Sequence, residues 1–110
     1  MSVRIMHFDP DATGPAVFLG PTEAQVMEIA WMHSPVSVKR VLFLLDVDEK
    51  PAYTTIMTML SRLTQKGLLF REKEGRYFVY RYTVSRERFL RERVTLVQRT
   101  LETNFPSYLR

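Results

Sequence analysis

The sequence contains no cysteine. This absence excludes disulfide bonds, thiolate metal sites and cysteine nucleophiles, so the stability of the fold must come from packing. Redox sensing and thiolate-based copper sensing are excluded as well. Histidine is scarce, with only His7 and His33, and we find neither the carboxylate and histidine spacing of a metal site nor a nucleophile elbow or phosphate-cradling glycine loop. We therefore predict a protein that is not an enzyme and needs no metal or cofactor.

Long apolar runs are also missing. No stretch of about 18 apolar residues is available for a membrane span, and the first ten residues lack the apolar stretch of a signal peptide. We therefore expect a cytoplasmic protein without a membrane partner. Apolar residues make up 45% of the 110 residues, which is enough for one folded domain with a core and a short appendage.

The net charge of +4 hides an uneven distribution along the chain. Residues 1–61 carry four basic and seven acidic side chains, whereas residues 62–99 carry eleven basic and four acidic ones. This division suits a polyanion bound along one side of the protein, because each neutralised phosphate releases condensed counterions. A solvated basic surface is the alternative interpretation.

An amphipathic pattern over residues 51–67 predicts a helix with two different faces. Apolar residues at a spacing of three and four should pack on the body of the protein, namely Tyr53, Ile56, Leu60 and Leu63. The opposite face carries Thr54, Thr55, Thr58, Arg62 and Gln65. Short hydroxyl side chains beside a guanidinium suit close approach to base edges and phosphate oxygens. The pattern is typical of a DNA-reading helix, which should end at Gly67.

Two shorter helices are predicted before it. Thr22 and Gln25 have the spacing of a capping box for a helix over 22–33, whose apolar residues surround most of its circumference. Ser37 should cap a second helix, in which Val38, Val41, Leu42 and Leu45 share a face. Phe43 falls on the other side of that helix. We expect Phe8 and Phe18 of an N-terminal arm, residues 1–18, to cover it.

The charged segment 46–51 precedes the reading helix. Its carboxylates lack a second ligand cluster, so we interpret it as a solvated loop and not as a magnesium site.

A β-hairpin is predicted after Gly67. Residues 68–73 and 76–84 are rich in aromatic and branched side chains and flank Glu74-Gly75, a turn with a glycine for positive backbone angles. Phe78, Tyr80 and Tyr82 alternate with Val79 and Arg81, so one face of the hairpin should lie on the core. Arg71, Lys73 and Arg76 should decorate the tip and rim. Three helices and such a hairpin predict a mainly α winged helix-turn-helix domain over residues 19–84.

A last helix is predicted within residues 85–110, opened by Ser85 and Glu87. Leu90, Val94, Val97 and Leu101 form a narrow apolar seam with a four-three-four spacing, which Phe89 and Leu96 broaden. Such a seam suits a partner helix, so we predict a homodimer that forms through these four residues. The alternative is that the seam packs back on its own domain.

Two segments resemble the penicillinase repressor family, residues 19–31 and residues 52–58. The similarity extends from about residue 19 to 84 and includes Val36-Ser37-Val38, Arg62-Leu63, Lys66-Gly67-Leu68 and Gly75-Arg76. It implies a dimeric winged-helix repressor that binds double-stranded DNA at an inverted-repeat operator. In some members a membrane-bound β-lactam sensor triggers proteolysis of the repressor, so an upstream sensor-protease is a further implied partner.

The chain departs from the family in several places. An arm of 18 residues precedes the usual start, about 26 residues follow the wing where the family has a longer helical tail, and the cysteine motif of copper-responsive relatives is missing. Asn104-Phe105 is similar to the bond that is cut in some members, but Pro106 follows it and a dipeptide alone is weak support for cleavage.

These observations assign expected roles to individual residues. Base edges should be contacted by Thr54, Thr55 and Thr58, and phosphates by Ser37, Lys39, Tyr53, Arg62, Lys66 and Arg76. The ring of Tyr53 should stay packed while its hydroxyl reaches a phosphate. The alternative is a winged-helix adaptor for protein–protein interaction, in which Phe43 and the C-terminal seam bind a partner and the basic charge is incidental.

Overall fold

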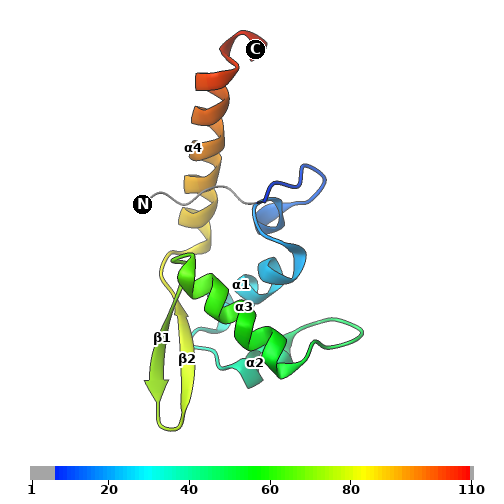
Figure 1. The fold of residues 1–110 in the computed structure, drawn as a ribbon, viewed down its shortest axis with the longest axis vertical. Coiled ribbons are helices and arrows are strands. Elements are labelled where there is room, and N and C mark those ends of the chain that lie inside the picture. Colours follow the sequence, from blue (N-terminus) through cyan, green and yellow to red (C-terminus); the bar gives the residue numbers. More distant parts are fainter. Residues whose placement is uncertain (1–6, 110) are drawn as a thin grey trace.

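The computed structural model describes residues 7–109 as a mainly α-helical fold with one β-hairpin (Figure 1). Its elements are, in order, η1 (Gly14–Val17), α1 (Pro21–His33), α2 (Val38–Leu44), α3 (Tyr53–Gln65), β1 (Leu69–Glu74), β2 (Tyr77–Tyr82), α4 (Arg86–Asn104) and η2 (Pro106–Tyr108). Three helices followed by a hairpin form a winged helix-turn-helix, as predicted. Within residues 7–109, no helix is long and apolar enough to cross a membrane.

The core lies where α1, α2 and α3 meet the base of the hairpin. Its fully buried side chains include Val26, Met27, Ala30, Val36, Val41, Ile56, Leu60, Leu63, Leu69 and Phe89. Helix α1 contributes Val26, Met27 and Ala30, with Ile29 and Trp31 packed at the margin. The prediction that this helix is buried on more than one side is therefore confirmed.

The helix starts differ in how they are capped. The predicted capping box of α1 is wrong, because the helix begins at Pro21 and no side chain caps it. Proline at the first position already lacks the N–H that a cap would satisfy. Ser37 caps α2 as predicted, since its Oγ accepts a 3.1 Å hydrogen bond from the backbone N–H of Arg40.

Helix α3 ends as the sequence predicted. Gly67 adopts φ 83°, a conformation that side chains with a Cβ rarely take. Its N–H donates to the carbonyl of Thr64, and the N–H of Leu68 donates to that of Leu63, both at 3.0 Å. These two bonds form a Schellman motif and direct the chain into β1.

The hairpin, or wing, pairs β1 with β2 in antiparallel register from Leu69 opposite Tyr82 to Glu74 opposite Tyr77. Gly75, at φ 63°, opens the two-residue turn. Of the alternating residues Phe78, Tyr80 and Tyr82, which share one face of the hairpin, only the second is covered by the core. Tyr80 is buried, whereas the other two are 41% and 40% exposed. Mutual backbone hydrogen bonds between Val36 and Tyr80, 2.8 and 3.0 Å long, fix the base of the wing, and the tip extends beyond the core.

The described part of the N-terminal arm packs beside the base of α4, not on Phe43. The ring of Phe18 makes an edge contact with that of Phe89, with centroids 6.5 Å apart, and Phe8 lies 6.4 Å from Phe18. Phe43 remains 73% exposed, with the Arg40 guanidinium 5.9 Å from its ring centre. The expected cover of Phe43 is therefore wrong, because the buried Phe89 offers the arm an apolar surface of its own. Residues 1–6 of the predicted arm lie outside the described residues.

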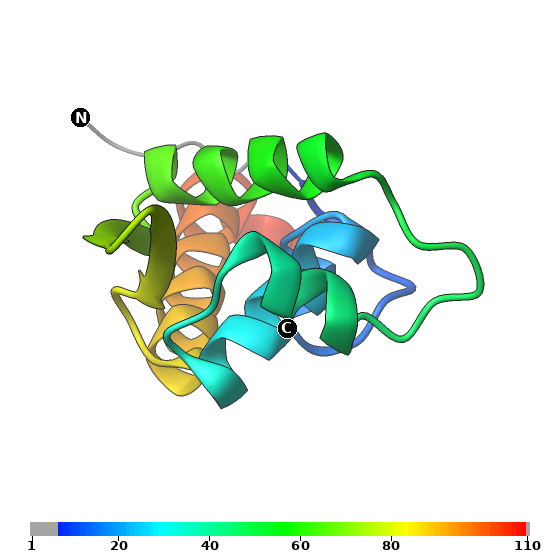
Figure 2. The same cartoon turned by 90° about the horizontal axis from the view of Figure 1, so that it is seen from below.

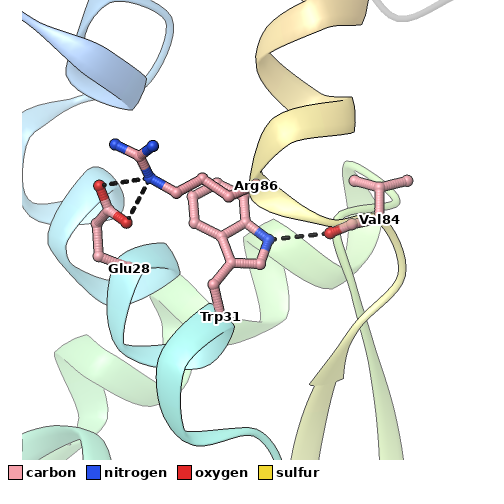
Figure 3. Close-up of polar contacts among 4 residues, drawn as sticks. All are labelled: Glu28, Trp31, Val84 and Arg86. Carbon is pink, nitrogen blue, oxygen red and sulfur yellow. Dashed lines mark hydrogen bonds and ion pairs between the residues drawn. The ribbon is translucent and has the colours of Figure 1, made fainter.

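Helix α4 is attached to the body at its first turns (Figure 3). The indole Nε1–H of Trp31 donates to the carbonyl of Val84 at 2.9 Å, just before the helix starts. The Arg86 guanidinium donates to the Glu28 carboxylate at 2.9 and 3.2 Å, and this hydrogen bond, together with the carboxylate charge, raises the pKa of Arg86. Ser85 caps the helix by accepting from the N–H of Arg88.

The rest of α4 extends away from the body, in the direction opposite to the wing (Figure 1). At 1.5 Å per residue the 19-residue helix is about 28 Å long. The radius of gyration is 15.6 Å, compared with roughly 13 Å for a compact domain of this size. The protein is thus a compact body with a projecting helix.

Candidate nucleic-acid interface

The outer face of α3 is exposed along its length. Figure 2 shows this helix, in green, along one edge of the molecule, with α1 and α2 on its inner side. Thr54, Thr55, Thr58 and Arg62 are all exposed and together line a shallow hollow of about 260 Å³ with Met59. The three threonines expected at base edges and the arginine expected at a phosphate therefore share one continuous surface.

A larger groove, the wing groove, runs between the starts of α2 and α3 and the wing. It has a volume of about 410 Å³ and is lined by Ser37, Val38, Lys39, Tyr53, Met57, Arg76, Tyr77, Phe78 and Tyr80. Four of the six residues expected at phosphates lie here, namely Ser37, Lys39, Tyr53 and Arg76. The only charged residues among these nine, Lys39 and Arg76, are both basic, so the groove favours an anionic ligand.

Tyr53 does not occupy the position that its spacing suggested. It is 49% exposed, whereas Ile56, Leu60 and Leu63 are fully buried. The core extends along α3 only as far as Ile56, so the ring of Tyr53, almost one turn earlier, lies in the wing groove. The prediction of a packed ring is wrong, but the phenol is accessible to a ligand in that groove.

Ser37 combines two roles without conflict. Its Oγ accepts the capping hydrogen bond from Arg40, and the hydroxyl hydrogen remains available as a donor. A hydroxyl at the first turn of a helix, beside Lys39, is well placed to donate to an oxygen of an anion in the wing groove.

Lys66 is placed away from both hollows. Its ammonium nitrogen lies 3.1 and 3.2 Å from the carboxylate oxygens of Glu23, in the first turn of α1, and the side chains are only 26% and 12% exposed. This ion pair joins the end of α3 to the start of α1. It favours a structural role for Lys66 over the phosphate contact that its sequence position suggested.

The two faces of the wing differ in charge. Directly opposed residues of a hairpin share a face and successive residues alternate, so Arg71 and Lys73 lie on the face of Tyr80 and Phe78, which line the wing groove. Glu72 and Glu74 lie on the other face, where Glu72 pairs with Arg81. The wing therefore turns its basic face toward the groove.

Arg71 lies on this face, although it was not among the residues predicted to contact a phosphate. Its guanidinium lies 4.0 Å from the ring centroid of Phe78, a cation–π contact that holds the side chain in place. A basic residue at every second position of a strand opposite aromatic residues is the sequence signal that indicates such an arrangement. Alternation alone, however, cannot say which face of the wing turns toward α3.

The four residues of the predicted seam lie along one side of α4. Leu90 packs against the core margin, Val97 is partly exposed, and Val94 and Leu101 are 54% and 39% exposed. Beside the seam, Arg93 lies over the ring of Phe89 with its guanidinium 4.8 Å from the centroid, and burial lowers its pKa. Beyond Leu90, the described chain therefore leaves most of the seam uncovered.

The buried three-helix core, the exposed hydroxyl face of α3 and the basic-faced wing together define a winged helix-turn-helix protein. The family model of the penicillinase repressor matches residues 19–110. The chain belongs to the penicillinase repressor family.

Individual relatives agree with this assignment. The penicillinase repressor of Bacillus licheniformis is 40% identical over 62 residues, which are 56% of this chain and 48% of that protein. The solution structure of the DNA-binding domain of the repressor BlaI is similar with a TM-score of 0.52 and 34% identity, over 73% of this chain and 89% of that one. The chain spans about half the length of the curated relatives it matches.

A further similar structure is a complex with a half-operator. The solution structure of the monomeric form of Bacillus licheniformis BlaI in complex with the blaP half-operator matches with a TM-score of 0.51 and 37% identity. The match covers 61% of this chain and 82% of that chain.

Proposed function

We propose that this protein is a sequence-specific transcriptional repressor that binds an inverted-repeat operator as a homodimer in the cytoplasm. The observation that carries the proposal is the exposed threonine face of α3 beside a groove whose charged residues are both basic, in a chain of this family. Repression follows when the bound dimer occupies a site that overlaps a promoter.

In this proposal α3 enters the major groove of duplex DNA. Thr54, Thr55 and Thr58 contact base edges or thymine methyl groups, and Arg62 grips the backbone further along the helix. A phosphate of the same strand lies in the wing groove, where Ser37, Lys39, Tyr53 and Arg76 supply donors. Arg71, on the basic face of the wing, adds a further phosphate contact.

The dimer is part of the mechanism. One winged helix reads only a few base pairs, so useful specificity needs two copies on major grooves about 34 Å apart. The structure of the monomeric form of BlaI with a half-operator supports the view that one copy reads one half of the site. Reading by α3 and dimerisation are then separable properties.

The test is selection of bound duplexes from a random pool, followed by affinity measurements at several salt concentrations. We expect an inverted repeat. Thr55→Ala should cost roughly 1–3 kcal/mol on the selected site and relax the base preference, whereas Arg76→Ala should weaken all duplexes about equally and lower the salt slope by about 1. Thr95→Ala and Arg99→Ala, on exposed positions of α4, are the matched controls. Unchanged affinity in both test variants would exclude the proposed footprint.

One observation favours the adaptor alternative, namely the 73% exposure of Phe43. A tight stoichiometric complex with another protein, formed without DNA and lost in Phe43→Ala, would support it. Enrichment of no motif from the random pool would point the same way. Strongly salt-dependent binding to duplex DNA would favour the repressor.

A further inference from the structure

Helix α4 meets the body of the protein through two residues that lie almost one turn apart. Arg86 pairs with Glu28 of α1 (Figure 3). Phe89 is 1% exposed and packs beside Trp31, with ring centroids 5.6 Å apart. Residues three positions apart lie on the same face of a helix. The direction in which the rest of α4 projects therefore depends on this short contact.

The N-terminal arm of the same chain covers both of these residues. The Phe18 ring makes an edge contact with Phe89, and a Cβ at Gly14 would lie 3.3 Å from Nη2 of Arg86. Gly14 also adopts φ 61°, so a larger residue there would be strained and would press on the guanidinium. Further along α4, Val94 and Phe18 line the same hollow of about 260 Å³. The arm thus lies against the end of α4 that is attached to the body.

The described part of the arm is a closed loop with hydrogen bonds of its own. The N–H of Asp9 donates to the carbonyl of Val17, and that of Phe18 to the carbonyl of Pro15, both at 2.9 Å. Pro15 is buried, and Leu19, which follows the arm, is 2% exposed in the core. The loop is therefore anchored to the body on both sides of Phe18 and presents this ring to α4 in a fixed position.

The arm also lies outside the segment that defines the family, because the family model matches residues 19–110. Both the reading helix α3 and the projecting helix α4 belong to the matched segment. The arm therefore adds contacts from outside that segment at the joint between the part proposed to read DNA and the projecting helix.

We infer that the arm is a positioning segment, which holds α4 against the body and thereby sets the spacing of operator half-sites that the protein accepts. The inference rests on the proposed dimer, in which the projecting helices connect the two copies. A tilt of about 10° at the base of a helix about 28 Å long moves its far end by about 5 Å. This displacement exceeds the rise of one base pair, roughly 3.4 Å. A joint held by the arm selects one spacing, whereas a loose joint would accept several.

The first test measures the joint itself and needs no DNA. Because the chain has no cysteine, spin labels can be attached through Met32→Cys on α1 and Thr95→Cys on α4, both at exposed positions, and the labelled protein diluted into unlabelled chain. Phe18→Ala should broaden the distribution of distances between the labels by about twofold, as for a hinge that has lost its packing. Phe43→Ala, which removes an exposed phenylalanine elsewhere, should leave it unchanged. An equally narrow distribution in Phe18→Ala would overturn the inference.

Phe18 also packs on the core, so two further variants separate its position from a general loss of stability. Phe18→Leu keeps an apolar contact and should restore most of the narrow distribution. Phe8→Ala removes a ring that packs on Phe18 but is itself 55% exposed, so this variant should stay folded and broaden the distribution less than Phe18→Ala. Broadening that appears only in variants that have lost their helical circular dichroism would contradict a positioning role.

The second test measures the preferred spacing, on duplexes whose two half-sites are moved apart in steps of one base pair. The unaltered chain should bind its best spacing at least about tenfold more tightly than spacings two base pairs away, because a rigid pair loses effective concentration when the geometry does not match. Phe18→Ala should reduce this preference to about threefold or less and leave the affinity for a single half-site unchanged. Thr55→Ala is the control, since it should lower half-site affinity and keep the spacing preference.

The outcomes distinguish the inference from the proposed function. A spacing preference that persists in Phe18→Ala would overturn the inference, even if the protein binds its operator as proposed. Failure of the unaltered chain to bind any duplex would instead contradict the proposed function, whatever the label distances show.

Discussion

Helices α3 and α4 are both amphipathic, but the chain buries their apolar faces to different extents. The apolar side of α3, with Ile56, Leu60 and Leu63, is fully buried by the same chain. On the apolar side of α4 only Phe89 is fully buried, whereas Leu90 and Val97 are buried in part. The core thus covers one side of α3 and leaves its polar side exposed, whereas α4 leaves apolar side chains exposed, which fits the proposed dimer.

The largest effect should come from the buried face of α3. Leu60→Ala should lower the free energy of unfolding by about 2–5 kcal/mol, because the cavity left in a close-packed core adds to the lost transfer energy. Urea unfolding followed by circular dichroism measures it. Thr58→Ala, half a turn away on the exposed face, is the matched control and should stay within about 0.5 kcal/mol of the unaltered protein. Equal losses in the two variants would remove the contrast between the faces of α3.

The attachment of α4 should give the next largest effect. Trp31→Phe removes the indole donor and leaves the carbonyl of Val84 without its partner. We expect a loss of about 1–2 kcal/mol in unfolding free energy, together with faster hydrogen exchange at the first amides of α4. Exchange in α3 should rise only as far as global stability falls. A loss confined to the amides of α3 would mean that Trp31 does not hold α4.

A smaller effect is expected at the end of α3. Lys66→Met removes the ion pair with Glu23 but keeps much of the apolar stem. The pair is partly exposed, so we expect a loss of about 1 kcal/mol in unfolding free energy, and we expect the salt slope of DNA binding to stay as it is. Arg62→Met, on the same helix, should instead lower that slope by about 1 without loss of stability. A lowered slope in Lys66→Met would restore the phosphate contact that the sequence suggested.

The sequence predicted correctly those features that depend on a single helix or turn. The period of α3 separated Ile56 and Leu60 from the threonines, and Gly67 and Gly75 marked the ends of helix and strand. The predictions were wrong where contacts between distant segments determine the environment of a residue. Tyr53, at the edge of the core, has the spacing of a buried residue but lies in a groove that the wing completes, and the pairing of Lys66 with Glu23 links residues 43 positions apart.

Contacts between distant segments also explain why the predictions for the arm and the wing were incomplete. Alternation along β2 gives two faces, but contacts with distant segments decide which residues are buried, since Tyr80 pairs with Val36 and is buried whereas Phe78 is 41% exposed. Phe18 could have covered either Phe43 or Phe89, since both are phenylalanines without an obvious partner in the sequence. The arm packs beside the base of α4 because Phe89 is buried there among Trp31 and Phe18.

The smallest effect is expected on the open face of α4, and it sharpens the contrast with α3. Val94 is 54% exposed, and valine and serine have similar helix propensities. At concentrations where the protein is monomeric, Val94→Ser should therefore stay within about 0.5 kcal/mol of the unaltered chain in unfolding free energy. At high concentration the unaltered protein should gain stability from association, which the variant lacks, because a partner that binds only the folded state stabilises it by mass action. Melting curves over a hundredfold range of concentration measure both limits. A loss above 1 kcal/mol in the monomer would show that the chain itself covers this face, and α4 would then resemble α3.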